Sequence, residues 1–523
     1  MKKALFVLVL AGLAVAGPTW LARVDLSDGR TGRDLFDSGL TVVRDYGGYC
    51  LVLAASEQLG RPELAPLDAM APGRVWVWVL TRPDFDRTRL TGLGRIILED
   101  GPSVLLATTE SRVPELNRLP VELARVGAEP LVYSGLPAGP PPLPAVDDSL
   151  IWALVNKVNE DSVLGTIRRL QNFYTRYSTT DSCRVAGQWG RNKFIAYGCD
   201  STATHQFRTS YAPNVIGVKK GKLDPTKIYI FDGHLDNTSD YEPDRCPGSD
   251  DNASGSTAVL EACRVFAGID FDYTVYFILF TGEEQGLYGS TAFAESCYRR
   301  HDSVRAVLNF DMISYGRQNR DSLEVIGKTS PNCTWLVDAY RANCDTFAQL
   351  KTKKTMTSGN QYDYSDHAPF WNRGYFAFCG IERDFTPKYH TIGDTIGTLY
   401  YVNCGTNNWP MATKAIKAGV ATLAKLAGAR VPTGIGEGAE TPLPAELIAA
   451  RPALGPGPVN LFFSAPARPG ARVEVYDALG RQVGLFGVGG LRSAVSPETQ
   501  PGIYLFRLVD GGLTSTAKAI VTE

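Results

Sequence analysis

The sequence lacks the features by which several functional classes are identified. It has no glycine-rich phosphate loop, no basic stripe and no heptad array, and its formal net charge at pH 7 is -2. A chain with so little net charge has no electrostatic reason to bind nucleic acid or an anionic membrane surface. Beyond the N-terminal residues, no apolar run is long enough to cross a bilayer. We therefore expect no nucleic-acid partner and no membrane span in the mature chain.

The first residues have the pattern of an export signal. Lys2 and Lys3 precede a short apolar run, and "AVA" at 14–16 offers a small-residue cleavage site. The alternative, an N-terminal membrane anchor, is disfavoured because the run is too short to span a bilayer comfortably. We expect residues 1–16 to be a cleaved signal peptide and the mature protein to be secreted or at the cell surface.

The chain has ten cysteines but no C-x-x-C pair. In an exported protein this number favours some disulfides. Nine of the ten lie within 183–404, an odd number, so at least one is expected to stay a thiol. Cys183–Cys199 and Cys333–Cys344 are plausible bridges, although the sequence leaves the connectivity open.

Two proline-containing linkers divide the chain, whose 523 residues are enough for two or three domains. "LPAGPPPLPAV" (136–146) is stiff and cannot continue a helix or a central strand, and "VPTGIGEGAETPLP" (431–444) marks a second break. The expected order is an N-terminal α/β accessory or pro-domain (17–135), a Pro-rich linker (136–149), a large α/β domain (150–430), a linker (431–455) and a C-terminal β-sandwich (456–523).

The N-terminal region has a weak internal echo. "GYCLVLAASEQLGRPEL" (48–64) resembles "GPSVLLATTESRVPEL" (101–116) once a one-residue gap is allowed. Each copy has the pattern of a short apolar strand followed by a more polar stretch, which indicates a small duplicated α/β domain. Chance similarity between two amphipathic segments is the alternative. The domain could serve as a propeptide, a folding chaperone or a lid, and its residues do not choose among these.

Strand and helix patterns alternate through 150–430. Apolar runs such as "KIYIFDG", "YTVYFILF", "RAVLNF" and "YFAFCGI" are separated by segments of helical period. This alternation predicts a mostly parallel central sheet flanked by helices. The short strand-like pieces of 456–523, among them "NLFFSA" and "GIYLFRLVDGG", predict a small β-sandwich.

Acidic residues and a histidine follow three of the predicted strands. His234 follows "IYIFDG", Glu283 and Glu284 follow "VYFILFTG", and Asp311 follows "AVLNF". In parallel α/β sheets, ligands bind at the carboxyl edge, where the connecting loops converge. We therefore expect these side chains to meet at one edge of the sheet, with the Glu pair in a turn that points out of it.

A loop between the first two of these strands adds two more carboxylates. "CPGSDDNASGSTAV" (246–259) leads into an apolar helical run, so its aspartates have a simpler interpretation as acidic residues at a helix start. Packed carboxylates repel one another unless a positive charge lies among them. His with Asp and Glu suits zinc, or less selectively manganese or cobalt. The surplus of acidic ligands favours two ions that share a carboxylate and activate a bridging water.

Six short motifs of the chain together resemble those of a known family. "HLD", "GSDDNASG", "FTGEEQGLYGS", "NFDMIS", "SDHAPFW" and "YHTIGDT" occur in this order. Together they resemble the co-catalytic di-zinc aminopeptidases typified by secreted bacterial leucyl aminopeptidases. Glutaminyl cyclases, glutamate carboxypeptidases and the catalytically dead transferrin-receptor domains are relatives. The resemblance covers about 150–430 and makes that region a zinc peptidase domain.

The resemblance implies a set of metal ligands. His234 and Asp311 would bind one zinc ion, and Glu284 and His390 would bind the other. Asp251, the acidic residue three after the glycine of the family loop, would bridge the two ions. The retained ligand set argues against a dead receptor-like domain.

The resemblance also implies three catalytic or supporting residues. Glu283 would be the general base that deprotonates the metal-bridging water and later protonates the leaving amine. Asp236 would accept the second ring N–H of His234 and fix its tautomer. Tyr389 would donate to the developing oxyanion, with a buried core tyrosine as the alternative. Many family members carry Asn at or near Thr386, so the resemblance fixes the metal ligands but not the local loop or the substrate pocket.

The C-terminal tail has a resemblance of its own. "EVYDALGRQV", "PGIYLFRLVDGG" and "AKAIV" resemble the small β-sandwich sorting domains of proteins exported by the type nine secretion route. This implies an export machinery as a partner. An accessory sandwich for substrate or surface binding is the alternative.

These observations predict a secreted di-zinc aminopeptidase that removes N-terminal residues from peptides. Two alternatives stay open within the same family, a glutaminyl cyclase-like enzyme and a carboxypeptidase-like enzyme. A non-catalytic binding domain of the same fold is a third. Zinc content separates this last possibility from an enzyme, because a binding relic is expected to hold well under one zinc ion per chain.

Overall fold

The computed structural model divides the chain into two compact units, one ending at Pro432 and the other covering the residues after it. The predicted signal peptide lies outside the described residues. The structure describes residues 19–521 except for 27–28, 82–84, 102, 120, 128–129, 132–139, 317–320, 359–361, 398–407, 433–446, 453–458, 468–469, 489, 496–501 and 511–512.

The N-terminal domain, residues 19–131, contains two four-stranded antiparallel sheets. Their strand orders are β2-β3-β1-β4 and β6-β7-β5-β8, so the second sheet repeats the arrangement of the first. The elements of the first half are β1 (Thr19–Asp25), α1 (Gly32–Asp37), β2 (Thr41–Asp45), β3 (Tyr49–Ala55), η1 (Ser56–Gly60) and β4 (Ala65–Ala69). Those of the second half are β5 (Arg74–Leu80), η2 (Arg87–Leu90), β6 (Arg95–Asp100), β7 (Ser103–Thr109), η3 (Glu110–Arg112), α2 (Val113–Asn117) and β8 (Glu122–Val126).

The two segments with similar sequences occupy equivalent places in these sheets. Residues 48–64 form β3 and the turn after it, and 101–116 form β7 and the short helical stretch after it. The halves contact each other through aromatic side chains, since the Trp78 indole donates a 2.8 Å hydrogen bond to the Tyr46 hydroxyl. The duplicated sequence pattern thus corresponds to a duplicated strand arrangement.

The region after the N-terminal domain alternates helices and strands. Its elements in chain order are α3 (Asp148–Lys157), α4 (Glu160–Gln171), α5 (Asp181–Ala196), β9 (Ser201–His205), β10 (Asn214–Lys219), β11 (Asp224–His234), α6 (Ala253–Val265), β12 (Asp270–Phe271), β13 (Tyr273–Phe280), α7 (Tyr288–Arg299), β14 (Ser303–Phe310), β15 (Ser322–Lys328), α8 (Thr334–Asn343), η4 (Cys344–Ala348), β16 (Lys351–Thr357), α9 (His367–Trp371), β17 (Ala377–Glu382), α10 (Trp409–Ala427) and β18 (Ala429–Arg430).

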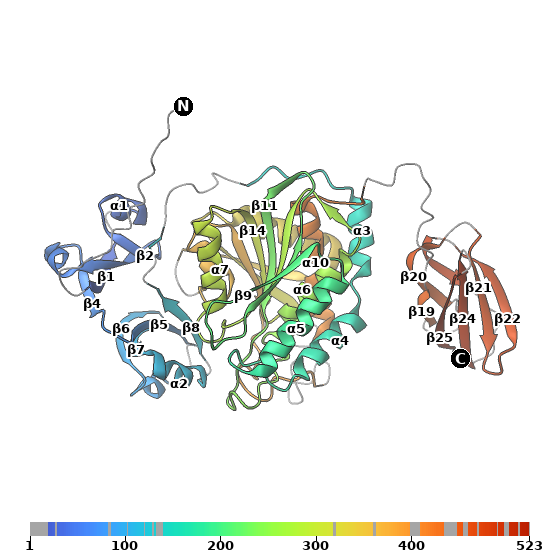
Figure 1. Cartoon of the computed structure of the whole chain (residues 1–523), viewed down its shortest axis with the longest axis horizontal. Coiled ribbons are helices and arrows are strands. Elements are labelled where there is room, and N and C mark those ends of the chain that lie inside the picture. Colours follow the sequence, from blue (N-terminus) through green and yellow to red (C-terminus); the bar gives the residue numbers. More distant parts are fainter. Residues whose placement is uncertain are drawn as a thin grey trace. The chain divides into compact units, whose positions relative to one another are not determined.

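An eight-stranded sheet with the order β16-β15-β17-β14-β11-β13-β10-β9 forms the centre of this region. The four central strands β13, β11, β14 and β17 run parallel, whereas β10 and β15 pair antiparallel with their inner neighbours. Helices flank the sheet, with α6 and α10 packed together and α7 packed on α9 (Figure 1). The predicted α/β fold with a mostly parallel central sheet is therefore confirmed.

Apolar side chains alternate between the two faces of the central strands. Phe277 and Phe280 of β13 are three residues apart, so they point to opposite faces. Phe277 packs against Phe194 of α5, and the ring centroids are 6.5 Å apart. Phe280 packs against Phe293 of α7 and Phe370 of α9, at 5.8 and 6.3 Å. Burial on both faces fixes the sheet and therefore the positions of the loops at its carboxyl edge.

The two disulfides predicted from the sequence are wrong for this structure. Cys183, Cys199, Cys333 and Cys344 are all free thiols. The Cys199 sulfur lies instead 3.4 Å from the sulfur of Cys263. Cys263 belongs to α6, which packs beside α5, the helix that contains Cys183. Proximity along the chain misidentified the neighbour because the fold brings a distant helix to Cys199.

The second unit contains two antiparallel sheets, β19-β20-β23 and β22-β21-β24-β25. Their strands are β19 (Leu447–Pro452), β20 (Val459–Ala467), β21 (Arg472–Asp477), β22 (Gln482–Gly487), β23 (Gly490–Val495), β24 (Gly502–Asp510) and β25 (Leu513–Val521). In the part of the chain that the structure describes, helices with the length and hydropathy of a membrane span do not occur.

Candidate metal centre

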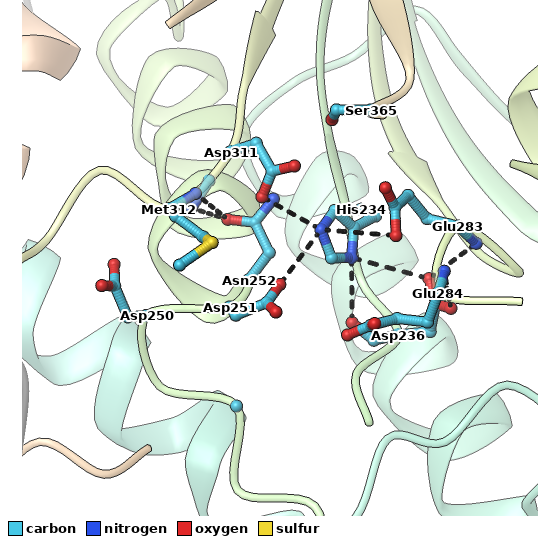
Figure 2. Close-up of polar contacts among 12 residues, drawn as sticks. His234, Asp236, Asp250, Asp251, Asn252, Glu283, Glu284, Asp311, Met312 and Ser365 are labelled. Carbon is cyan, nitrogen blue, oxygen red and sulfur yellow. Dashed lines mark hydrogen bonds and ion pairs between the residues drawn. The ribbon is translucent and has the colours of Figure 1, made fainter. Parts of the chain in front are cut away.

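The side chains predicted from the strand ends come from three adjacent strands. β11 ends at His234, which lies beside Phe280, the last residue of the neighbouring β13. Glu283 follows that strand by three residues, and Asp311 comes directly after β14 on the other side of β11. Figure 2 shows these side chains turned toward one another at the carboxyl edge of the sheet.

The acidic and imidazole groups form two sets that share one aspartate. His234 Nε2 lies 3.1 Å from Asp311 Oδ1 and 3.4 Å from Asp251 Oδ1. His390 Nε2 lies 2.9 Å from Glu284 Oε2 and 3.3 Å from Asp251 Oδ2. One oxygen of Asp251 therefore faces each histidine. The five side chains for which metal binding was predicted lie together.

A fourth carboxylate near the two histidines belongs to Glu283. Its Oε2 lies 4.0 Å from His234 Nε2, farther than the oxygens of Asp311 and Asp251. Glu283 is thus close to the first set without being its nearest oxygen donor. A carboxylate in this position can act as a base beside a metal site, and it also offers an oxygen within 4.8 Å of the ligand atoms of His234 and Asp311.

The donor set fits divalent cations such as zinc. His234, Glu283 and Asp311 offer ligand atoms within 4.8 Å of one another, and so do His234, Asp251 and Glu284. Among the described residues, Glu284 Oε1 has no hydrogen-bond partner, and neither does His390 Nε2 despite its short ion-pair distance to Glu284 Oε2; both atoms are buried. Buried polar atoms normally have partners, so these two are poised for a cation. Histidine and carboxylate ligands without thiolates are typical of catalytic zinc sites.

Electrostatics favour a positive charge at the same place. Burial raises the pKa of Glu283 well above its usual range, with neighbouring carboxylates adding to the effect and His234 opposing it. Burial and the charge of Asp251 raise the pKa of Glu284 to about 8. Burial alone would lower the pKa of His390, but the carboxylates beside it raise it. Bound cations relieve this repulsion and keep the carboxylates ionised.

The loop that carries Asp251 is fixed from both ends. The side chain of Asn252 caps α6 by accepting from Gly255 N, so neither aspartate of this loop serves as the helix cap. The Asp394 carboxylate accepts the backbone N–H groups of Asp250 and Asp251 at 2.9 and 3.0 Å. The simpler interpretation of the two aspartates as helix-start residues is therefore wrong, and Asp251 is left to face the histidines.

Asp236 contacts the His234 ring, but with its backbone carbonyl instead of the predicted carboxylate. His234 Nδ1 lies 3.1 Å from the backbone carbonyl of Asp236, whereas the carboxylate is 3.8 Å away. That carboxylate instead accepts the Ser178 hydroxyl at 2.7 Å and the backbone N–H groups of Glu283 and Glu284 at 3.4 and 3.3 Å. Asp236 therefore holds the turn of the Glu pair, while its main chain orients the imidazole.

A buried arginine that sequence reasoning missed supports the same loops. The Arg176 side chain is fully buried and donates to the carbonyls of Leu170, Leu235, Pro247 and Gly248 at 2.7–3.0 Å. Leu235 follows His234, and Gly248 begins the loop of Asp251. The guanidinium thus ties two ligand-bearing segments together. Arg176 stands alone in "YTRYS", outside every motif, so no sequence signal marked it.

Tyr389 contacts the N-terminal domain rather than an open pocket. Its ring stacks on His390 with centroids 3.7 Å apart, and its hydroxyl donates to the carboxylate of Glu122 in β8. Burial raises the pKa of Glu122 to about 7, His390 lowers it, and Asp251 and Asp311 raise it. Glu122 therefore lies beside the Tyr389–His390 pair. It was also missed, because a glutamate in an unremarkable strand gives no signal.

Two residues of the centre adopt backbone angles that are uncommon outside glycine. Met312, directly after Asp311, has φ 50°, and His390 has φ 54°. Left-handed backbone in non-glycine residues costs about 1–3 kcal/mol and is found mostly where the surroundings impose it. Met312 is held by its N–H, which donates to Asn252 Oδ1 at 3.2 Å. The fold thus accepts local strain in order to place these side chains.

Comparison with known proteins supports this interpretation of the fold. The LapA aminopeptidase of Legionella pneumophila covers 68% of this chain and 98% of its own, with a TM-score of 0.53 and 21% identity. LapB from the same organism also covers 68% of this chain, with a TM-score of 0.52 and 18% identity. At these identities the likeness establishes the fold alone.

Relatives in sequence cover part of the chain. A probable zinc metalloprotease of Pyrenophora teres f. teres is 30% identical over 202 residues, which are 34% of this chain and 42% of that protein. A probable leucine aminopeptidase of Arthroderma otae is 27% identical over 262 residues, 47% of this chain and 70% of that protein. The stretch 214–412, which contains both ligand sets and Glu283, matches the model of peptidase family M28.

Proposed function

We propose that this protein is a zinc-dependent aminopeptidase that holds two zinc ions. The observation that carries the proposal is the position of Asp251, whose two carboxylate oxygens face His234 and His390 at 3.4 and 3.3 Å. A shared carboxylate of this kind is the arrangement expected for a pair of ions rather than a single one. His234 and Asp311 would hold one ion, and Glu284 and His390 the other.

The residues of the chain divide the chemistry among them. Zinc ions bound there would polarise the scissile carbonyl and make a water molecule acidic enough to attack near neutral pH. Glu283 would take the proton of the attacking water and pass it to the leaving amine. The Asp236 carboxylate accepts the backbone N–H of Glu283 and so holds this residue in place. Deep burial raises the pKa of the Glu283 carboxyl, which makes Glu283 a stronger base than an exposed glutamate.

The names of relatives favour substrates with a free amino end. A probable leucine aminopeptidase of Arthroderma otae and one of Arthroderma benhamiae are among the proteins that the chain resembles. The charge of the site does not choose between the two ends of a peptide, because the three ligand carboxylates and Glu283 balance the four positive charges of two zinc ions. The relatives therefore support an aminopeptidase over a carboxypeptidase.

We also propose that the protein is exported and acts outside the cell. The support is the signal-like N-terminus and the C-terminal resemblance to sorting domains of the type nine route. Expression in a host with that route, followed by mass spectrometry of the N-terminus of the exported chain, is expected to give a chain starting after Ala16. Retention of the full-length chain inside the cell would contradict the proposal.

A metal and substrate survey tests the enzymatic proposal. The full chain, dialysed against zinc-free buffer, is expected to keep about two zinc ions and to release p-nitroaniline from free aminoacyl p-nitroanilides. N-acetylated forms of the same substrates, which have no ammonium group, are expected to react at least about 100-fold more slowly in kcat/KM. Equal rates on the blocked substrates would overturn the aminopeptidase assignment.

Two further results of the survey would point elsewhere. Cyclisation of N-terminal glutaminyl peptides without hydrolysis would identify a glutaminyl cyclase-like enzyme. Well under one zinc ion per chain, with no turnover, would identify a binding domain of the same fold.

A further inference from the structure

A carboxylate from the N-terminal domain enters the candidate metal centre. Glu122 is the first residue of β8, which lies at the edge of its sheet beside β5. Its carboxylate accepts the Tyr389 hydroxyl, and the Tyr389 ring stacks on His390 with centroids 3.7 Å apart. The charge of Glu122 also acts on the proposed base Glu283. Glu122 thus reaches the centre beside Tyr389 and His390.

The flanks of β8 are anchored to the loops around the centre. Arg118 forms an ion pair of 3.2 Å with the buried carboxylate of Glu242. Arg125 donates to the backbone carbonyl of Gln285, the residue after Glu284, at 3.2 Å. The same guanidinium lies 4.2 Å from the ring centroid of Tyr288. Charge-assisted contacts therefore hold Arg118 and Arg125, which lie on either side of Glu122 in the sequence.

The turn of the Glu pair is shaped to receive this segment. Gly286 has φ 107°, and a Cβ added there would lie 2.8 Å from the Cγ of Arg125. Tyr288 donates its hydroxyl to Glu110 of the N-terminal domain, and Glu110 also binds Arg125 and Arg208. The contact is thus a fitted polar interface between two parts of one compact unit.

The result is a closed site. None of the six residues of the two ligand sets and the base is more than 6% exposed, and Tyr389 is 4% exposed. A peptide must bring its N-terminal residue to these groups before it can be hydrolysed. While β8 is docked, the Glu122 carboxylate and the segment around it stand in that path.

We propose that the N-terminal domain is a built-in inhibitor of the proposed peptidase, with Glu122 occupying the place of the substrate over the two metal positions. This inference rests on the proposed function. It selects the lid among the roles that the sequence left open for the domain. Activity then requires that β8 move away, and the fraction of molecules with β8 displaced limits the observed rate.

The opposite role for Glu122 would be to bind the ammonium group of the substrate. A residue with that role is expected on one side of the centre, near one ligand set, with room for a peptide beside it. Glu122 instead takes the hydrogen bond of Tyr389, the hydroxyl for which a contact with the substrate was predicted, and the ligands beside it are at most 6% exposed. The position therefore favours competition with the substrate.

Glu122→Gln separates the two roles because they predict changes of opposite sign. Glutamine keeps the size and can still accept the Tyr389 hydrogen bond, but it removes the negative charge that the metal positions attract. In the zinc-loaded full chain, we expect kcat/KM for leucine p-nitroanilide to rise about tenfold or more. We expect zinc removal by 1,10-phenanthroline to speed up by a similar factor, since it too needs an open site.

Arg125→Ala gives a second route to the same result. It weakens the contact of β8 with the loops around the centre without changing a metal ligand. It is expected to raise both kcat/KM and the rate of zinc removal. Arg112→Ala is the matched control, because Arg112 belongs to the same domain but is half exposed and pairs only locally with Glu115. It is expected to change neither rate.

Three outcomes decide the inference. A higher KM and lower kcat/KM for Glu122→Gln would assign Glu122 to substrate binding and overturn the inhibitor. Parent rates of both hydrolysis and zinc removal in both variants would overturn it as well, while leaving the proposed function intact. Faster zinc removal in variants that hydrolyse no substrate would support the lid and count against the peptidase.

Discussion

Glu283→Gln is expected to keep about two zinc ions per chain while kcat on aminoacyl p-nitroanilides falls by about 10²–10⁴-fold. The amide has the shape of the carboxylate but cannot accept the proton of the attacking water. Zinc binding should survive because Asp311 and Asp251 lie closer to His234 than Glu283 does. Zinc analysis after dialysis and steady-state kinetics on the same sample measure both quantities.

The neighbouring glutamate is the matched control for this experiment. Glu284 has the same chemistry and comparable burial, but its Oε2 lies 2.9 Å from His390 Nε2. Glu284→Gln is therefore expected to lose zinc as well as activity. Turnover at the parent rate in Glu283→Gln, with zinc retained, would show that another group is the base.

Asp251→Asn is expected to have the second large effect, since it weakens both metal positions at once. The variant should retain about one zinc ion or fewer and lose measurable turnover, because ligands must be anionic to balance the ions. Zinc at about 100 times its Kd stabilises the parent by about 2.7 kcal/mol, and the variant should gain little of this. Thermal unfolding with and without zinc measures the difference.

Asp250→Asn is the control on the adjacent position. The Asp250 carboxylate accepts from the backbone N–H and hydroxyl of Ser314, both at 2.9 Å, and does not face the histidines. It should keep both zinc ions and show the stabilisation by zinc. If Asp251→Asn also binds two ions and unfolds at a temperature that rises with zinc as in the parent, the shared-carboxylate arrangement is wrong.

The sequence predicted the parts of the centre that depend on strand order. Histidine and carboxylates directly after apolar runs gave His234, Glu283 and Asp311, because parallel strands present their ends at one edge. Asp251 and His390 depended on the family resemblance, since long loops bring them to the edge and no local pattern fixes where a loop ends. The structure places all five together.

Contacts made across the fold were the part that sequence reasoning missed. The role given to Asp236 assumed that its carboxylate would reach His234, but the turn carries the carboxylate to the Glu pair and leaves the main-chain carbonyl at the ring. The predicted cysteine pairs failed for the same reason, since Cys199 meets the distant Cys263. The spacing of residues along the chain predicts neither the direction in which a side chain points nor its neighbours from distant segments.

Arg176 and Glu122 show a second limit. A buried arginine that binds four carbonyls looks, in sequence, like any surface arginine. Glu122 lies in a domain that has no histidine and no acidic cluster, so composition assigned it no part in the centre. Both depend on how separate segments of the chain meet.

The two similar sheets of the N-terminal domain differ in their contacts with the candidate metal centre, because Glu122 belongs to the second sheet. β8 begins with Glu122, whereas β4, which takes the same place in the first sheet, begins with Ala65. Two sheets of the same arrangement, of which only the second sends a carboxylate to the candidate metal centre, are under different constraints. Substitutions in the first sheet can therefore accumulate without changing the groups around the centre.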